Sequence, residues 1–275
     1  PSNVLIVYSL ASGGVSIAAL FLAGYIPGIL TCLFLMLVAS IWAKRKGYVI
    51  SQKSSAKEVF SSFLSALPSL LLLFIVIGGI VAGFFTATEA SAIAVLYTLV
   101  LGIIYKEIKF KDLSIIFLES SKTSSIVLLL IACSMSMSWV MSYENIPQNL
   151  SDFLIGISDN KIIILLMINL ILLFVGIFMD ITPAVLIFTP IFLPVIKSIG
   201  IDPIQFGIIM VVNLCIGLCT PPVGSVLFVG VGIAKTSIEK VIKPLLPLFI
   251  AMIVALGLIT YFPEITLWLP EKFGF

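Results

Sequence analysis

The sequence predicts an all-α, polytopic membrane protein in which two long apolar stretches are interrupted. Hydrophobic residues make up 61% and charged residues 10% of the 275 residues, which is typical of a chain with several membrane spans. Residues 161–197 and 203–234 are each too long for one straight crossing, because a helix rises ~1.5 Å per residue and the hydrocarbon core is ~30 Å thick. Both stretches also carry glycine and proline near the middle. We therefore expect a helical hairpin in the first and a broken transmembrane helix in the second.

Composition and motifs exclude several functions. The net charge of +2 is too small to indicate a nucleic-acid partner, and the chain has no histidine, the usual proton shuttle and metal ligand. The sequence lacks HExxH, GxSxG and a P-loop, and Glu89 and Asp180 have no motif residues of an intramembrane aspartyl protease beside them. The four cysteines lie in apolar runs without CxxC spacing, which is typical of cysteines that act as small hydrophobes in helices. We expect a protein that is not an enzyme.

The first elements lead to one clear crossing. An apolar segment begins at residues 4–8 and loosens at Gly13 and Gly14, and residues 17–26 form a short piece closed by Pro27. Residues 29–42 make the first convincing crossing, which ends at a basic cluster, Lys44, Arg45 and Lys46. Basic clusters mark the cytoplasmic side. Because the chain opens directly on a hydrophobic run without a methionine, we expect it to start inside a longer protein.

The next elements alternate between interfacial and crossing pieces. Residues 57–66 are amphipathic and read as a surface helix, 68–85 cross outward, and 90–105 cross back to a second lysine cluster. Thr86 or Thr88 is expected to cap the returning helix, with Glu89 in its first turn. Residues 112–119 are a second amphipathic piece and 124–143 cross outward. Residues 144–160 contain acids but no lysine or arginine, as expected of an outside loop.

The basic residues near the C-terminus support the hairpin. Lys235, Lys240 and Lys243 fall on the cytoplasmic side only if residues 161–197 enter and leave the bilayer on the same side. This holds both for a hairpin that spans the bilayer and for one that dips part-way. Residues 245–261 then make the last crossing and leave a short tail.

Asp180 has two readings from spacing alone. At the tip of the hairpin, its charge would help to hold a cation or order the tip. Alternatively, it caps the second helix at the membrane interface, with Thr182 or Pro183 in the first turn.

The motif NLCIGLCTPPVGS, residues 213–225, interrupts the second stretch. Tandem prolines at 221 and 222 remove two backbone donors, so a regular helix cannot continue through them. Interrupted backbone at that depth survives where protein buries it or where it lines a wet cavity. Its carbonyls and the Thr220 hydroxyl suit Na⁺. The alternative reading is ordinary kinks and close helix contacts.

Three blocks together resemble the large membrane subunit of TRAP (tripartite ATP-independent periplasmic) transporters. They are GIFMDITPA at residues 176–184, GIIMVVNL at 207–214 and TPPVG at 220–224. Residues 85–90, residues 20–28 and the Pro1-Ser2 start match the same pattern. The resemblance covers nearly the whole chain, which is similar to the C-terminal two-thirds of family members.

The resemblance implies a bacterial inner-membrane carrier for Na⁺-coupled uptake of an organic anion such as sialic acid or a C4-dicarboxylate. Its implied partners are a small membrane subunit and a periplasmic binding protein, with Na⁺ as coupling ion and no organic cofactor. It also implies an ion-transporter-type fold with inverted repeats, a re-entrant hairpin and an elevator motion. The alternative is a Na⁺/anion symporter of a related family that needs no binding protein.

The resemblance also assigns domains and sites. Residues 1–14 would be the end of the broken helix of the first repeat, and residues 15–121 would form the scaffold with its interfacial arms. Residues 122–235 would form the second-repeat transport domain, with its hairpin at 161–198 and its broken helix at 203–235. Residues 236–275 would form the final helix and the tail. The implied sodium-binding residues are Gly176, Asp180, Thr182, Gly217, Thr220, Pro221 and Gly224. The implied substrate-binding residues are Pro1, Ser2 and Asn213.

Overall fold

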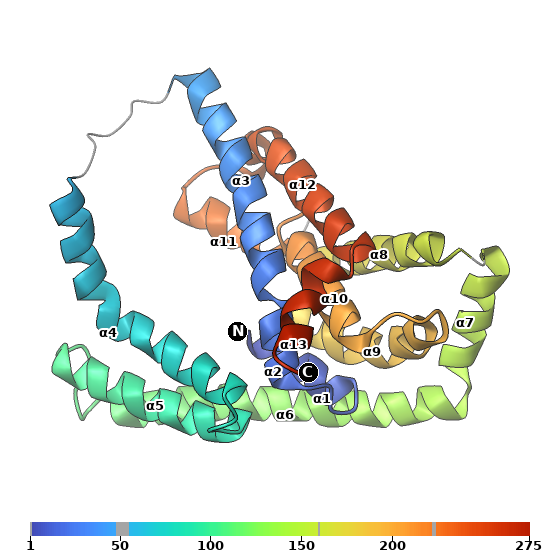
Figure 1. The fold of residues 1–275 in the computed structure, drawn as a ribbon, viewed down its shortest axis with the longest axis horizontal. Helices are drawn as coiled ribbons and strands as arrows, with labels where there is room; N and C mark the ends of the chain where they lie inside the picture. The colour runs from blue at the N-terminus through green and yellow to red at the C-terminus, as the bar shows by residue number, and fades with distance from the viewer. Residues whose placement is uncertain (1, 48–54, 159, 222–223) are drawn as a thin grey trace. The chain divides into compact units, whose positions relative to one another are not determined.

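The structure is a computed structural model that describes residues 2–47, 55–158, 160–221 and 224–275 (Figure 1). Within these ranges it contains thirteen helices and no strand. The chain divides into two compact units: unit 1 comprises Pro1–Lys46 with Leu129–Phe275, and unit 2 comprises Gly47–Leu128. The prediction of an all-α chain is therefore confirmed.

Seven helical segments among the described residues are long and apolar enough to cross a membrane. They are Ile17–Lys46, Ala56–Val81, Ala87–Ile104, Leu113–Tyr143, Lys161–Phe178, Ile181–Ser198 and Ile238–Tyr261. Short polar side chains accept a backbone N–H at the start of many helices, as expected of N-caps. These caps are Ser2, Ser16, Ser55, Thr86, Asn160, Asp180 and Asp202.

Unit 1 begins with three helices: α1 (Asn3–Ala11), α2 (Ile17–Ala23) and α3 (Tyr25–Lys46). The predicted loosening after α1 is confirmed, since Gly13 and Gly14 both have positive φ. The prediction that Pro27 closes the second piece is wrong. α2 ends earlier, and Pro27 lies in the first turn of α3, where its missing N–H breaks no helical hydrogen bond.

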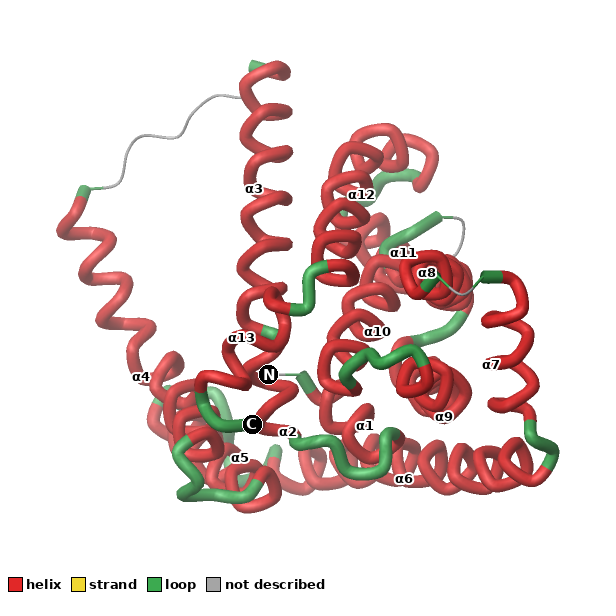
Figure 2. The backbone as a smooth tube through the Cα atoms, turned by 45° about the vertical axis from the view of Figure 1, so that its right-hand side comes forward, coloured by secondary structure: helices red, strands yellow, loops and turns green. Residues whose placement is uncertain are grey.

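The core of unit 1 forms around α10 (Pro203–Leu218), which contacts α8 (Lys161–Phe178), α9 (Ile181–Ser198) and α12 (Ile238–Tyr261). Figure 2 shows α10 beside the α8–α9 hairpin, with α12 above. α10 buries most of its residues, including Phe206, Met210 and Leu214. The helix that positions the predicted break is thus the central helix of its unit.

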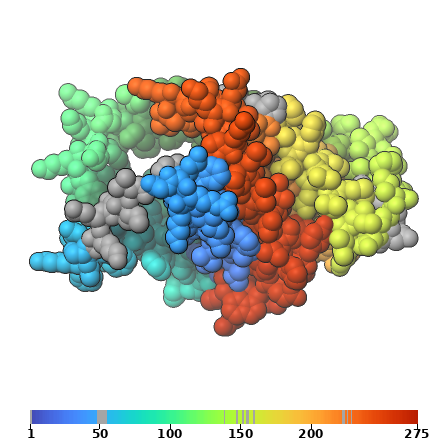
Figure 3. Space-filling view, turned by 90° about the horizontal axis from the view of Figure 1, so that it is seen from above, coloured from blue at the N-terminus to red at the C-terminus, as the bar shows by residue number. Residues whose placement is uncertain are grey.

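The C-terminal part differs from the prediction in two details. α12 starts at Ile238 rather than near residue 245, and it continues through Pro244 and Pro247. The predicted tail contains a helix, α13 (Glu264–Lys272), which contacts α2. In Figure 3 the blue spheres of α3 lie against the orange and red spheres of α12, and the two helices contact each other extensively.

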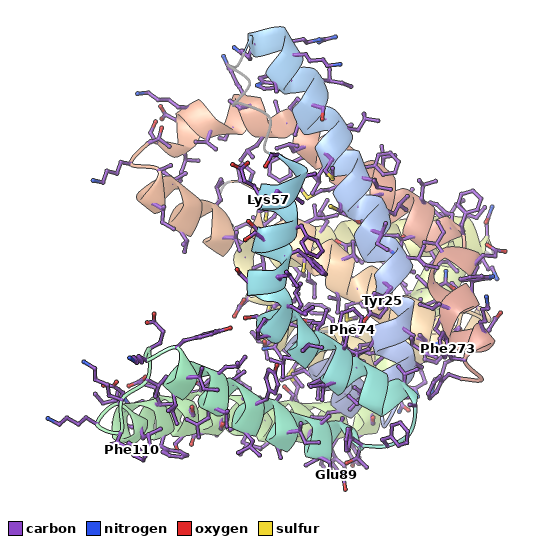
Figure 4. All side chains as sticks on the ribbon, turned by 60° about the vertical axis from the view of Figure 1, so that its left-hand side comes forward. Tyr25, Lys57, Phe74, Glu89, Phe110 and Phe273 are labelled. Atoms are coloured by element: carbon purple, nitrogen blue, oxygen red, sulfur yellow. The ribbon has the colours of Figure 1, made fainter. Side chains whose placement is uncertain are left out.

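Unit 2 contains α4 (Ala56–Val81), α5 (Ala87–Ile104) and the first part of α6 (Leu113–Tyr143). The predicted surface helix and the crossing after it form one helix, α4, that bends along its length; Figure 4 shows Lys57 and Phe74 on its two arms. Pro68 lies inside it, and proline kinks a helix by removing one hydrogen bond without always ending it. The Tyr97 hydroxyl of α5 donates to the Pro68 carbonyl at 2.6 Å.

Two further boundaries were predicted wrongly. The pieces expected at 112–119 and 124–143 form the single helix α6, in which the Lys122 ammonium and the Thr123 hydroxyl both bond to Glu119 across the expected junction. The expected outside loop contains α7 (Ile146–Ile157), which contacts α9. Pro147 lies in the first turn of α7, where proline is tolerated.

The predicted functional domains stay a prediction. The two compact units group the residues that contact one another, whereas the predicted domains group the residues that would move together during transport. Both arms of the hairpin are 18 residues long. Either a spanning or a re-entrant hairpin fits that length, since 18 residues rise about 27 Å.

Candidate functional site

The hairpin turns within two residues, Met179 and Asp180, between α8 and α9. The Met179 N–H donates to the Val175 carbonyl at 2.9 Å and ends α8. The Asp180 side chain is exposed and is the N-cap of α9, where its Oδ1 accepts the Ile181 N–H at 2.8 Å. The structure therefore bears out the capping role, at a residue that is also at the tip of the hairpin.

The transmembrane helix is broken where the sequence predicts it. α10 ends at Leu218, and α11 (Ser225–Ile233) begins after Gly224. The Thr220 N–H donates to the Gly217 carbonyl at 2.9 Å, and its hydroxyl donates to the Ile216 carbonyl at 2.7 Å. A hydroxyl that donates its proton to a helix carbonyl keeps its lone pairs for another partner.

Two glycines join the hairpin to the broken helix. A Cβ at Gly217 would lie 2.6 Å from the Cα of Gly176, and a Cβ at Gly176 would lie 3.1 Å from the Cα of Gly217. Only glycine on both sides allows backbones to approach this closely. The end of α8 and the end of α10 are therefore in direct backbone contact.

Backbone carbonyls converge at the break. Gly224 has φ +27°, and a Cβ there would lie 2.7 Å from the Leu218 carbonyl oxygen and 2.9 Å from that of Thr220. Glycine at this position thus lets the backbone of residue 224 approach two carbonyl oxygens that any Cβ would collide with. Carbonyl oxygens of unwound backbone are typical ligands of Na⁺ in carriers.

A buried carboxamide pair lies behind this contact. The Asn213 Nδ2 of α10 donates to both the Oδ1 of Asn169 at 2.7 Å and its backbone carbonyl at 2.9 Å. Since Asn169 precedes Gly176 on α8, and Asn213 precedes Gly217 on α10, the two helices run in the same direction along their contact. Their C-terminal ends are therefore at the same end of the pair.

This arrangement fixes the electrostatics of the site. A helix C-terminus carries partial negative charge and an N-terminus partial positive charge. The C-termini of α8 and α10 favour a cation, and the Asp180 carboxylate at the hairpin tip adds negative charge. The N-terminus of α9 already holds the Asp180 carboxylate as its cap, whereas the N-terminus of α11 has no side-chain cap and favours an anion.

The main cavity of unit 1 reaches the break. It has a volume of about 780 Å³ and is lined almost wholly by apolar side chains from α1, α2, α3, α10 and α12. Its lining includes the hydroxyl-bearing residues Ser2, Tyr25 and Thr31, together with Cys219, the C-cap of α10. Figure 4 labels Tyr25 near the start of α3.

The predicted sodium-site residues lie on two elements, which the contact between Gly176 and Gly217 joins. Gly176, Asp180 and Thr182 belong to the hairpin tip; Gly217, Thr220, Pro221 and Gly224 belong to the break. Of the predicted substrate residues, Ser2 lines the cavity, whereas Asn213 is fully buried against Asn169. Pro1 lies outside the described residues.

Sequence reasoning missed three buried polar residues: Asn169 of α8, Gln205 of α10 and Thr260 of α12. The Asn169 Nδ2 donates to the Thr260 hydroxyl at 3.1 Å, and the Gln205 Nε2 donates to the Thr260 carbonyl at 3.1 Å. All three side chains are buried. Their signal in the sequence is an amide or hydroxyl within an otherwise apolar transmembrane run, which is costly unless it is paired.

Comparison with known proteins identifies the family. A family model described as "Tripartite ATP-independent periplasmic transporter, DctM component" matches residues 1–265. The chain belongs to this family. The TRAP large permeases are transporter subunits and not enzymes, and this membership with seven membrane-capable helices makes the chain a multi-pass protein of the inner membrane.

Individual relatives match over the whole chain. "Uncharacterized protein YgiK" of Salmonella typhimurium is 61% identical over 274 residues, which cover 100% of this chain and 63% of the relative. The sialic acid TRAP transporter large permease protein SiaM of Vibrio cholerae is 39% identical, over 99% of this chain and 64% of the relative. The C4-dicarboxylate TRAP transporter large permease protein DctM of Rhodobacter capsulatus is 35% identical, over 100% of this chain and 66% of the relative. The chain thus spans less than two-thirds of the length of these relatives.

Proposed function

We propose that this chain forms part of a TRAP permease that uses a Na⁺ gradient to take up a small organic anion delivered by a periplasmic binding protein. A small membrane subunit would complete the permease, and an elevator motion of the transport domain would carry the substrate. The observation that supports this most directly is the contact between Gly176 and Gly217, which joins two interrupted helical elements within one unit.

The residues present fit a Na⁺ ion. A hard cation takes oxygen ligands. The Leu218 and Thr220 carbonyl oxygens both lie close to Gly224, and the Thr220 hydroxyl, which donates its proton to the Ile216 carbonyl, keeps its lone pairs for another partner. The Asp180 carboxylate at the hairpin tip would supply negative charge from the other element. We expect Na⁺ in this region, held mainly by oxygens of the break.

The substrate class follows from the N-terminus of α11. That helix end has no side-chain cap and favours a carboxylate close to the cation, whereas the Asp180 carboxylate already caps α9. Bound Na⁺ would then raise the affinity for the anion, and by linkage the anion would raise the affinity for Na⁺. Relatives are named for sialic acid, C4-dicarboxylates and 2,3-diketo-L-gulonate, all of them acids. Ser2 on the cavity wall remains our candidate for substrate contact, and Asn213 would need α8 and α10 to separate before it could reach a substrate.

The test is Na⁺-driven uptake by the full-length permease reconstituted with its small subunit and binding protein. Thr220→Ala should raise the half-saturating Na⁺ concentration about tenfold, the size of effect seen when a supporting group at an ion site is lost. Thr98→Ala is the matched control, because the Thr98 hydroxyl makes the same bond, to the Ala94 carbonyl at 2.8 Å, in unit 2.

Two results would overturn the proposal. Equal Na⁺ dependence in the Thr220→Ala and Thr98→Ala variants would show that Na⁺ does not bind at the break. Full uptake by the permease without any binding protein would instead favour the receptor-independent symporter.

A further inference from the structure

The contact between α8 and α10 contains a polar pair that an apolar membrane helix does not need for its own stability. Asn213 is 0% exposed and Asn169 is 8% exposed. Burying a carboxamide costs free energy unless its hydrogen bonds are made again inside the protein. One atom, the Asn213 Oδ1, has no hydrogen-bond partner among the described residues. A leucine would avoid that cost, so the pair requires another explanation.

The geometry of the pair fixes a register. The Asn213 Nδ2 binds both the side chain and the backbone carbonyl of the same residue, Asn169. A donor held by two acceptors on one residue defines both the position along α8 and the rotation about it. Apolar side chains give no such directionality, since helices in a bilayer gain little from hydrophobic burial against each other.

The register matters because of the glycines. Asn169 and Gly176 are seven residues apart, two turns of α8, and Asn213 and Gly217 are four residues apart, about one turn of α10. Both pairs therefore lie along the same contact. A slip of one residue turns a helix by about 100°, which would bring a Cβ from Ile177 or Val175 against the Gly217 backbone.

A third helix holds the pair in place. The Asn169 Nδ2 donates to the Thr260 hydroxyl of α12, and Gln205 at the start of α10 donates to the Thr260 carbonyl. Asn169 therefore has both its donor and its acceptor engaged, which orients the carboxamide that Asn213 binds.

We propose that Asn213 is a positioning residue whose bonds to Asn169 fix the register of α8 against α10 and so hold the hairpin tip beside the helix break. Its role at the Na⁺ site rests on the proposed function, whereas its role in the register does not. Buried polar pairs that select one register among apolar contacts are known from other helix assemblies.

The first experiment measures the register without Na⁺. Gly176→Ala in the purified full-length permease should lower the melting temperature by on the order of 5 °C, because the new Cβ is held against α10. In an Asn213→Leu background α8 and α10 are free to shift against each other. There, Gly176→Ala should lower the melting temperature by less than half as much. Asn169→Leu breaks the pair from the other side and should give the same non-additivity. Additive shifts in both backgrounds would overturn the proposal.

The second experiment measures Na⁺-dependent thermal stabilisation of the same permease. Asn213→Leu should raise the half-saturating Na⁺ concentration about tenfold, as expected when support for an ion site is lost. The matched control is Thr189→Val, which removes another fully buried polar contact to α10, the bond to the Met210 sulfur at 3.4 Å.

The two experiments separate the two proposals. If Thr189→Val shifts the Na⁺ response as much as Asn213→Leu, any buried polar change suffices and the positioning role is wrong. If wild-type permease shows no Na⁺ stabilisation while the temperature shifts remain non-additive, the proposed Na⁺ site fails and the register role stands.

Discussion

The two units of the chain hold their helices together in different ways. In unit 1, α10 buries most of its side chains and makes backbone and carboxamide contacts with α8. In unit 2, α5 buries only Ala90 among its residues, and α4 buries three near its end, Ile77, Gly79 and Ile80. Unit 1 therefore contains a core that fixes relative positions, whereas most side chains of α4 and α5 in unit 2 are not buried. Fixed positions are what an ion site requires.

The glycines of the two units give the strongest test of this difference. A Cβ at Gly217 would meet the backbone of Gly176, which cannot move aside, so Gly217→Ala should destabilise the permease by about 3 kcal/mol. A Cβ at Gly102 in α5 would meet only the Ile108 side chain, whose end can rotate away, so Gly102→Ala should cost less than about 1 kcal/mol.

Thermal unfolding of the two glycine variants measures the difference, at roughly 2–4 °C for each kcal/mol in a chain of this size. Replacement of glycine by alanine raises the helix propensity by the same amount at both positions, so this contribution cancels when the two variants are compared. Equal shifts would mean that the α8–α10 contact can relax as easily as a side chain in unit 2.

Two tyrosines allow a matched comparison in which the expected change in stability is smaller than for the glycines. The Tyr8 hydroxyl donates to the Pro203 carbonyl in unit 1, and the Tyr97 hydroxyl donates to the Pro68 carbonyl in unit 2, both at 2.6 Å. Tyr8 is 0% exposed, and its ring packs where a Cβ of Gly207 would be, whereas Tyr97 is half-buried.

Loss of a hydrogen bond costs more where water cannot replace it. Tyr8→Phe should destabilise by about 1.5 kcal/mol and Tyr97→Phe by about 0.5 kcal/mol. Urea unfolding monitored in each unit by a local fluorescent label would resolve these values. A larger effect at Tyr97 would show that unit 2 shields its contacts as well as unit 1 does.

The sequence predicted the interruptions because their causes are local. Tandem proline at 221 and 222, glycine at 217 and 224, and aspartate before Ile181 each act within a few residues of the backbone that they shape. The same holds for Thr86 and Glu89, whose reciprocal bonds begin α5 as predicted. Most of the hairpin and break could therefore be predicted before any contact was known.

Contacts between elements could not be predicted in this way. That Asn169 meets Asn213 depends on how α8 packs on α10, and no local pattern fixes that register. The boundaries at Pro68 and around residues 120–123 were wrong for a related reason, since neither one proline nor a short polar patch by itself ends a helix.

The caps of α5 and α9 are expected to give effects of about 1 kcal/mol or less, and they separate two roles of Asp180. Thr86 makes three hydrogen bonds with Glu89, and Thr86→Ala should destabilise the start of α5 by about 1 kcal/mol, seen as faster hydrogen exchange there.

Asp180 accepts one backbone N–H, which asparagine can also accept, so Asp180→Asn should leave the stability of α9 nearly unchanged. Its missing charge should still raise the half-saturating Na⁺ concentration by roughly two- to fivefold, as expected for a charge in contact with solvent. If the Na⁺ response is unchanged while Asp180→Ala loosens α9, the carboxylate serves only as a helix cap, and the oxygens of the break must hold the cation without it.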